Sequence, residues 1–260
     1  METLYTRDIN SNLGLCMPLA IRITLFVAVI LLALTACRSV PPTEVPIPSI
    51  AAIKSDSPNR SLIVMLPGMG DRADTFQTSG FLDGGDQWNF DVLAVDAHFG
   101  YYRERNLIPR LHEDVIIPAK VSGYENIWLL GISMGGFGSL LYAEQYPEIV
   151  SGIILLAPFL GEPEIAQSIE AEGGLDSWSP DDARGFEDYE ISIWSWLKDA
   201  SNGSNDARVI LGFGRSDRMA KNYGPLIDAL DPDQVYQIDG GHKWTTWAPL
   251  WSQIAADLEL

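Results

Sequence analysis

Cysteine is almost absent from this sequence. The 260 residues include two cysteines, Cys16 and Cys37, and both lie within the first 37 positions. The rest of the chain therefore has no thiol, no disulfide and no cysteine-ligated metal site. It is nevertheless long enough for one large domain, which buries roughly 70% of its unfolded surface without disulfides.

Basic residues are also scarce. The sequence has 17 lysines and arginines against 35 aspartates and glutamates, a formal net charge of −18 at pH 7. Residues 1–37 contain two acids and two bases, so their removal would leave this charge unchanged. Such an acidic surface disfavours nucleic acid and anionic lipid headgroups as partners, because both are polyanions.

No apolar run is long enough to cross a bilayer as a helix. The longest candidate is Ile23–Leu34, 12 uncharged residues that follow Arg22, and it has the proportions of a signal-peptide core. An ordinary cleaved signal and an uncleaved anchor both agree with this run. Met17 precedes the same pattern, so translation could also start there.

The run ends in Leu34-Thr35-Ala36-Cys37, which resembles the lipobox of bacterial lipoproteins. In that family the peptide is cut before the cysteine, which is then acylated. The resemblance implies a signal peptide over residues 1–36 and a mature chain that begins at a lipidated Cys37. We therefore expect a lipid-anchored membrane protein of the bacterial cell envelope, on the periplasmic or outer-membrane side.

Proline is concentrated in the segment that follows. Residues 37–58 contain five prolines among small polar residues. Because proline stiffens the chain and removes a backbone donor, we predict a semi-extended tether between the lipid and the domain. An early edge strand within the same segment is the alternative.

Apolar runs alternate with helical patterns over the remaining chain, which predicts the α/β class. The apolar runs lack the alternation of half-exposed strands, so a mostly parallel sheet with helices on both faces is expected. The predicted strands are Ser61–Leu66, Phe90–Asp96, Asn126–Leu130, Val150–Leu156, Arg208–Phe213 and Gln234–Ile238. The predicted helices are Leu107–Val121, Met134–Tyr146, Arg218–Leu230 and Trp244–Asp257.

A Gly-x-Ser-x-Gly pattern, Gly131-x-Ser133-x-Gly135, joins the third predicted strand to a predicted helix. This context is that of a nucleophile elbow. A strand can reverse into a helix within one residue only if the nucleophile is strained, and side chains at the flanking glycines would clash there. A Gly-rich turn with an unreactive serine is the alternative interpretation.

Two further strand ends carry the residue types that such a serine needs. Asp217 follows the strand Arg208–Phe213, and His242 follows Gln234–Ile238, which gives the chain order Ser, Asp, His. The carboxyl ends of parallel strands meet at the ligand-binding edge of an open sheet. Asp239 is a rival partner for His242, but it lies only three residues before it.

With these residues in place, the chain from Arg60 to Leu260 resembles an α/β-hydrolase, and we place that domain at residues 59–260. The resemblance implies that Ser133 is the nucleophile, that His242 is the base and that Asp217 orients it. Leu66-Pro67-Gly68-Met69-Gly70 resembles the oxyanion turn of that family. The backbone N–H groups of Met69 and Met134 are therefore expected to bind the oxyanion.

The two other histidines receive less specific interpretations. His98 follows the strand Phe90–Asp96 and is expected to be a loop histidine, with the mouth of the site as the alternative. His112 is expected to be solvated on a helix.

An insertion of about residues 160–205 resembles the short lid of α/β-hydrolases. Residues 161–190 contain ten acids and one base, most simply a solvated face, because their spacing is not that of a calcium loop. Trp178, Trp194 and Trp196 could line a substrate pocket, but packing of a helical excursion on the sheet is the favoured interpretation.

Together these features predict a serine hydrolase that cleaves a small-molecule carboxylic ester through an acyl-enzyme, with no metal or organic cofactor. A thioesterase or an acyltransferase would use the same residues. The alternative of another class is a non-catalytic envelope lipoprotein that uses the fold as a binding scaffold.

Overall fold

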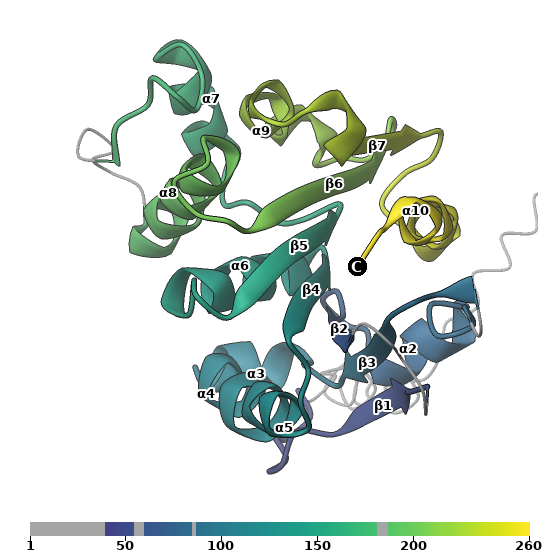
Figure 1. Ribbon diagram of the computed structural model, residues 1–260. Coiled ribbons are helices and arrows are strands. Elements are labelled where there is room, and N and C mark those ends of the chain that lie inside the picture. The colour runs from purple at the N-terminus through teal and green to yellow at the C-terminus, as the bar shows by residue number, and fades with distance from the viewer. Residues whose placement is uncertain (1–39, 55–59, 85–86, 181–186) are drawn as a thin grey trace, which may run out of the picture. The chain divides into compact units, whose positions relative to one another are not determined.

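A seven-stranded sheet organises the described part of this computed structural model, residues 40–54, 60–84, 87–180 and 187–260. The strands stand in the order β1-β3-β2-β4-β5-β6-β7 (Figure 1). β1 pairs antiparallel with β3, and every other neighbouring pair is parallel. In chain order the strands are β1 Ser49–Ala52, β2 Ser61–Leu66, β3 Asp91–Val95, β4 Asn126–Ile132, β5 Val150–Leu156, β6 Arg208–Gly214 and β7 Val235–Ile238.

The six predicted strands are confirmed to within two residues at each end. The apolar runs do not alternate with polar residues because the strands are covered by helices on both faces. In β2, for example, every residue is buried. The predicted mostly parallel sheet is therefore the observed one.

Strand β1 lies in the proline-rich segment and corrects the predicted domain boundary. The Pro48 carbonyl accepts a hydrogen bond from the Asp96 N–H, and the Ile47 N–H donates to the Asp114 carboxylate. An edge strand needs partners on one side only, so nearby prolines do not prevent it. The prediction of a free tether is thus wrong for residues 41–54, and residues 37–39 and 55–59 lie outside the described part.

Helices cover both faces of the sheet, as predicted. On one face lie α2 and α10, and on the other lie α3 to α6 and α8 (Figure 1). The α-helices are α2 Ala73–Thr78, α3 Phe99–Arg103, α4 Leu107–Leu111, α5 Ile117–Val121, α6 Met134–Gln145, α7 Pro163–Ala171, α8 Asp188–Ser201, α9 Gly224–Ala229 and α10 Trp244–Asp257.

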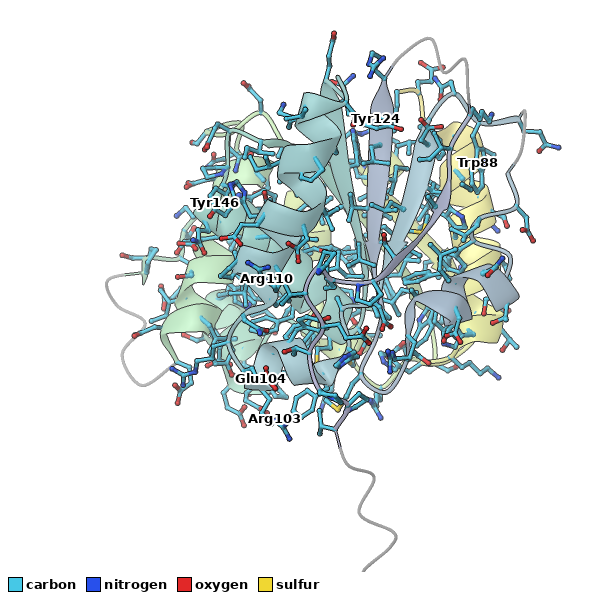
Figure 2. All side chains as sticks on the ribbon, turned by 90° about the horizontal axis from the view of Figure 1, so that it is seen from below. Trp88, Arg103, Glu104, Arg110, Tyr124 and Tyr146 are labelled. Carbon is cyan, nitrogen blue, oxygen red and sulfur yellow. The ribbon has the colours of Figure 1, made fainter. Side chains whose placement is uncertain are left out.

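Two predicted helices are modified in the structure. The helix predicted at Leu107–Val121 is continuous but contains a π-helical turn at His112–Ile116 between α4 and α5. Arg110, at the end of α4, pairs there with Glu113 and Asp114 (Figure 2). The helix predicted at Arg218–Leu230 is reduced to α9 and a short 3₁₀ turn, because Pro225 has no backbone N–H to donate to the preceding turn and is tolerated only in the first turn of a helix.

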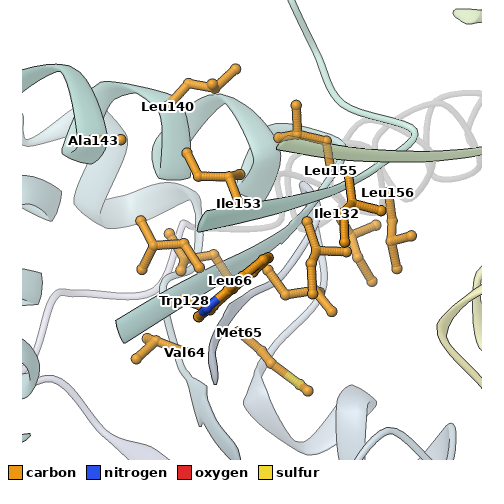
Figure 3. Close-up of a cluster of buried hydrophobic side chains, with 14 of the residues drawn as sticks. Val64, Met65, Leu66, Trp128, Ile132, Leu140, Ala143, Ile153, Leu155 and Leu156 are labelled. Carbon is orange, nitrogen blue, oxygen red and sulfur yellow. The ribbon is translucent and has the colours of Figure 1, made fainter. Parts of the chain in front are cut away.

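Apolar side chains pack on both faces of the sheet beside the predicted serine turn. Leu140 and Ala143 of α6 face Ile153 of β5, while Trp128 and Ile132 of β4 lie on the opposite face of the sheet (Figure 3). All five side chains are buried. Burial of apolar surface on this scale fixes the end of β4, and with it the residue that follows, Ser133.

His98 has a structural role at the start of α3. It is 3% exposed, and its Nδ1 accepts a hydrogen bond from the Gly100 N–H over 3.0 Å. Burial lowers the pKa of His98, the nearby Arg72 lowers it further, and Asp96 opposes both effects. The folded protein therefore resists protonation of this imidazole.

This burial predicts how stability depends on pH. The unfolded chain takes up a proton on His98 as the pH falls through about 6.5, whereas the folded chain resists that proton. The contribution to the free energy of unfolding is thus complete above that pH and declines as the pH falls. A His98→Asn variant keeps a capping acceptor but cannot titrate, so it should lose less stability between pH 7 and pH 5.

Urea unfolding of both proteins at the two pH values measures this difference. The remaining titratable groups are common to both proteins and cancel in the comparison. Equal losses of stability in the wild type and the variant would contradict the role given to His98.

Candidate active site

Ser133 occupies a strained turn between β4 and α6. Its backbone has φ 52° and ψ −113°, a region that non-glycine residues rarely adopt. The Ser133 N–H donates to the Leu156 carbonyl over 3.0 Å, and its carbonyl accepts from the N–H groups of Gly136 and Phe159. The surrounding backbone therefore holds the serine in the conformation that lifts its hydroxyl off the sheet.

The flanking glycines are required for the predicted reason. A Cβ atom on Gly131 would lie 2.3 Å from the Gly135 carbonyl oxygen, and one on Gly135 would lie 2.1 Å from the Leu66 carbonyl oxygen. Real Cβ atoms do not approach oxygen so closely. The glycines thus let β2, β4 and α6 converge at the serine.

In the structure, Ser133, His242 and Asp217 form one hydrogen-bonded triad. The Ser133 Oγ lies 3.0 Å from His242 Nε2, and His242 Nδ1 lies 2.9 Å from Asp217 Oδ2. The Asp217 side chain is fully buried, and its Oδ1 also accepts the Met219 N–H over 2.9 Å. The carboxylate is therefore fixed from two sides, and it orients the imidazole toward the serine.

The loops that carry His242 and Asp217 are joined to each other. They follow the neighbouring strands β7 and β6, and the Ser216 N–H donates to the Gly240 carbonyl over 2.8 Å. The indole of Trp247 meets the His242 ring edge to face, with 4.9 Å between centroids. These contacts set the position of the imidazole.

Asp239 does not compete for His242 in this structure. Its side chain is 95% exposed and pairs with the Arg215 guanidinium over 2.9 Å. Between the two predicted candidates, the structure therefore places Asp217 beside the histidine.

A cleft of about 520 Å³ opens beside Ser133. Met69 and Met134, the predicted oxyanion residues, both line it. Met134 is the first residue of α6, where N–H groups have no intrahelical partner. A Cβ atom on Gly68 would lie 3.6 Å from Ser133 Cβ, so the turn before Met69 packs directly against the serine.

Sequence reasoning missed several residues of this cleft. Phe159, Met219 and Trp247 form apolar walls, and Trp244 donates its indole N–H to Asp71 over 3.1 Å. Burial raises the pKa of Asp71, which the Trp244 hydrogen bond partly offsets. Asp71 and Trp244 are 173 positions apart in the chain, and no local pattern connects them.

Arg218 and Lys243 also line the cleft, and here a sequence signal existed. Each residue directly follows a predicted site residue, Asp217 or His242. A loop that positions one side chain also constrains its neighbour.

Several residues discussed in the sequence analysis do not line the cleft. His112 is half-buried rather than solvated, because its ring stacks on Tyr146 at 4.1 Å and its Nδ1 lies 2.9 Å from the Tyr142 hydroxyl. Among the described residues between 160 and 205, none lines the cleft, and a lid over it stays a prediction. Trp178, Trp194 and Trp196 are buried, which agrees with the packing interpretation.

The helices of this insertion are held by buried polar contacts instead. The Glu190 carboxylate accepts the N–H groups of Glu162 and Glu187, at 2.6 and 3.0 Å. The Trp194 indole donates to the Leu160 carbonyl over 2.9 Å. The described part of the insertion therefore packs as a fixed crossover between β5 and β6.

Within the described residues, no group of three or more His, Cys, Asp or Glu side chains is arranged to hold a metal ion. None of the helices described combines the length and hydropathy that a membrane span requires. Cys37, the predicted lipidation site, lies outside this part of the chain.

Comparisons with known proteins agree on the fold. A family model described as alpha/beta hydrolase fold matches residues 120–191, which include Ser133. A search of curated proteins finds no match.

Solved structures resemble this chain over most of its length. Est1E from Butyrivibrio proteoclasticus is 16% identical with a TM-score of 0.54, covering 80% of this chain and 91% of its own. A protein from Thermoplasma acidophilum titled a predicted CIB-like hydrolase is 17% identical with a TM-score of 0.53, at 81% and 92% coverage. The S-formylglutathione hydrolase FrmB from Staphylococcus aureus is 14% identical with a TM-score of 0.52, at 83% and 97% coverage. These matches confirm the predicted fold class.

The close approach at Gly135 predicts a large effect of one methyl group. A Gly135→Ala variant should be destabilised by about 3 kcal/mol or more, since overpacking typically costs 1–3 kcal/mol and here the clash is with fixed backbone. Thermal unfolding of the purified protein measures the loss.

Gly241→Ala is the matched control for this substitution. Its Cβ would meet no atom closer than the Ser216 carbonyl oxygen at 3.6 Å, an ordinary contact. If both variants melted at the wild-type temperature, the tight convergence at the serine turn would be refuted.

Proposed function

We propose that this chain, which has the α/β-hydrolase fold, is a serine hydrolase that cleaves carboxylic esters of small molecules. One observation carries the proposal, the triad in which Ser133 Oγ, His242 and Asp217 are joined at 3.0 and 2.9 Å beside a cleft. A serine hydroxyl is nearly unreactive alone, and this arrangement supplies the base that it needs.

In the proposed reaction, His242 Nε2 takes the proton of Ser133 as Oγ attacks the ester carbonyl carbon. Asp217 accepts a hydrogen bond from the Nδ1–H and stabilises the imidazolium that forms. The N–H groups of Met69 and Met134 are proposed to bind the negative oxygen of the tetrahedral intermediate. His242 then protonates the departing alcohol, which leaves the acyl group on Ser133.

The second half of the cycle repeats these roles with water. His242 removes a proton from a water molecule, which attacks the acyl carbonyl carbon. The tetrahedral intermediate collapses, His242 returns a proton to Ser133 Oγ, and the carboxylic acid leaves. The enzyme is restored with no cofactor consumed.

The composition of the cleft supports small esters as the substrate class. Its volume of about 520 Å³ is within the range of small-molecule sites, and Phe159, Trp244 and Trp247 provide apolar walls. Among the structural neighbours, one is titled a ferulic acid esterase, and Est1E has a structure with ferulic acid bound. Their identities of 15–16% make these names suggestive of the reaction class only.

A fluorophosphonate probe tests whether Ser133 is an activated nucleophile. We expect one covalent adduct per chain, located at Ser133 by peptide mapping and absent from a Ser133→Ala variant. An Asp217→Asn variant should react at least about 100-fold more slowly, because the imidazole loses the partner that fixes its tautomer.

Asp239→Asn is the matched control, since it also removes one carboxylate near His242 but from an exposed position. It should react at the wild-type rate. Folded wild-type protein that stayed unlabelled would favour the non-catalytic scaffold, and equal slowing in both variants would reject Asp217 as the orienting residue.

We further propose that the mature chain begins at a lipidated Cys37 and is held at the membrane of the cell envelope. The support is the signal-like run before Cys37 and the lipobox-like sequence that ends in it. Expression in a bacterium fed a fatty acid that can be tagged should give a labelled chain whose intact mass places its first residue at Cys37.

Cys37→Ser should abolish both the label and the cleavage. Cys16→Ser is the control, because it removes the other cysteine and should leave label and mass unchanged. A mature chain cut at another position and free of fatty acid would refute the lipid anchor without affecting the hydrolase proposal.

A further inference from the structure

Positive charge collects at the cleft of an otherwise acidic protein. Arg218 and Lys243 line it, although the sequence carries a formal net charge of −18. They follow Asp217 and His242 directly, so the loops that build the catalytic triad also carry the cations. The two charges thus come from separate loops that meet at one site.

The other arginines near acidic groups are neutralised locally. Arg72 pairs with Asp96, and Arg110 pairs with Glu113 and Asp114. Arg208 and Arg215 likewise face Asp233 and Asp239. In the part of the chain that the structure describes, no salt bridge includes Arg218 or Lys243, and both residues are exposed.

Negative charge in the cleft does not cancel these cations. Among the described residues that line it, Asp71 is the one acid, and its carboxylate is engaged by the Trp244 indole. Asp217 is fully buried, and its carboxylate is hydrogen-bonded to His242 Nδ1 over 2.9 Å. Among the residues that line the cleft, the two cations Arg218 and Lys243 therefore outnumber the single acid.

We propose that Arg218 and Lys243 bind a negatively charged group of the substrate, so that the preferred esters carry a carboxylate or a phosphate near the scissile bond. This inference rests on the proposed serine hydrolase function and names its substrate class. A guanidinium presents a fork of donors that suits the paired oxygens of either anion, and the lysine adds a point charge.

The overall charge of the protein makes such a local site necessary for an anionic substrate. A net negative field disfavours the approach of anions, and cations at the mouth of a cleft reverse that field where binding occurs. The apolar walls formed by Phe159, Trp244 and Trp247 can hold the uncharged part of the same molecule.

A matched pair of esters isolates the effect of one charge. Mono-para-nitrophenyl adipate has a free carboxylate, and its methyl ester has the same chain with that charge removed. We expect wild-type kcat/KM to be about 10-fold higher for the charged ester, since two partly exposed ionic contacts each contribute modestly. The double variant Arg218→Gln/Lys243→Gln should abolish this preference, mainly through a higher KM for the charged ester.

A second ester pair, with a terminal phosphate in place of the carboxylate, separates the two anion types. The pair whose preference falls further in the double variant identifies the better ligand. In the wild type the preference should also decline in about 0.5 M NaCl, because salt screens exposed charges. This salt test needs no variant and does not depend on how the variants fold.

Lys221→Gln is the matched control, since Lys221 is an exposed cation three residues after Arg218 that does not line the cleft. It should keep the wild-type preference. If the wild type hydrolysed both esters equally, or if the double variant kept the preference, the anion site would be refuted while the hydrolase remained. If neither ester were hydrolysed and Ser133 resisted the fluorophosphonate, the proposed function itself would fail.

Discussion

The reversal of the chain at Ser133 is the constraint on which the site depends. A residue held at this φ and ψ costs about 1–3 kcal/mol, so neighbouring contacts must offset that energy. The Ser133 N–H donates a hydrogen bond to the last residue of β5, and its carbonyl accepts hydrogen bonds from the first turn of α6 and from the segment after β5. These contacts offset the strain. The strain is thus distributed over the centre of the sheet, where buried apolar contacts make the backbone hardest to move.

From that fixed point, the strand order determines which residues can meet. β5, β6 and β7 stand side by side and parallel, so their carboxyl ends lie progressively further along one edge from Ser133. A histidine after β7 must therefore extend back across the loop after β6 to reach the serine. The hydrogen bond between Ser216 and Gly240 ties these two loops together, and Asp217 fills the space between them.

The sheet and the contacts among Ser133, His242 and Asp217 could be predicted because these features are encoded locally. Continuous apolar runs predicted six strands, and the short segments after three of them predicted Ser133, Asp217 and His242 as neighbours. Strand β1 remained an alternative in the prediction because its four residues are exposed or half-exposed and follow prolines, and its backbone partner is the distant strand β3. The packing surface of the insertion could not be predicted, because a helical pattern in α8 indicates an apolar face but not the surface against which it packs.

A local sequence pattern does not show which charged residues folding brings together at the cleft. The acidic composition disfavours polyanionic partners over the whole surface. This effect does not extend to the cleft, because electrostatic interactions in salt decay over roughly 10 Å and only nearby groups act on a bound substrate. There Arg218 and Lys243 face a single, hydrogen-bonded acid, Asp71. A protein can therefore repel anions as a whole and still bind a small one at the single site where its own acids are buried or engaged.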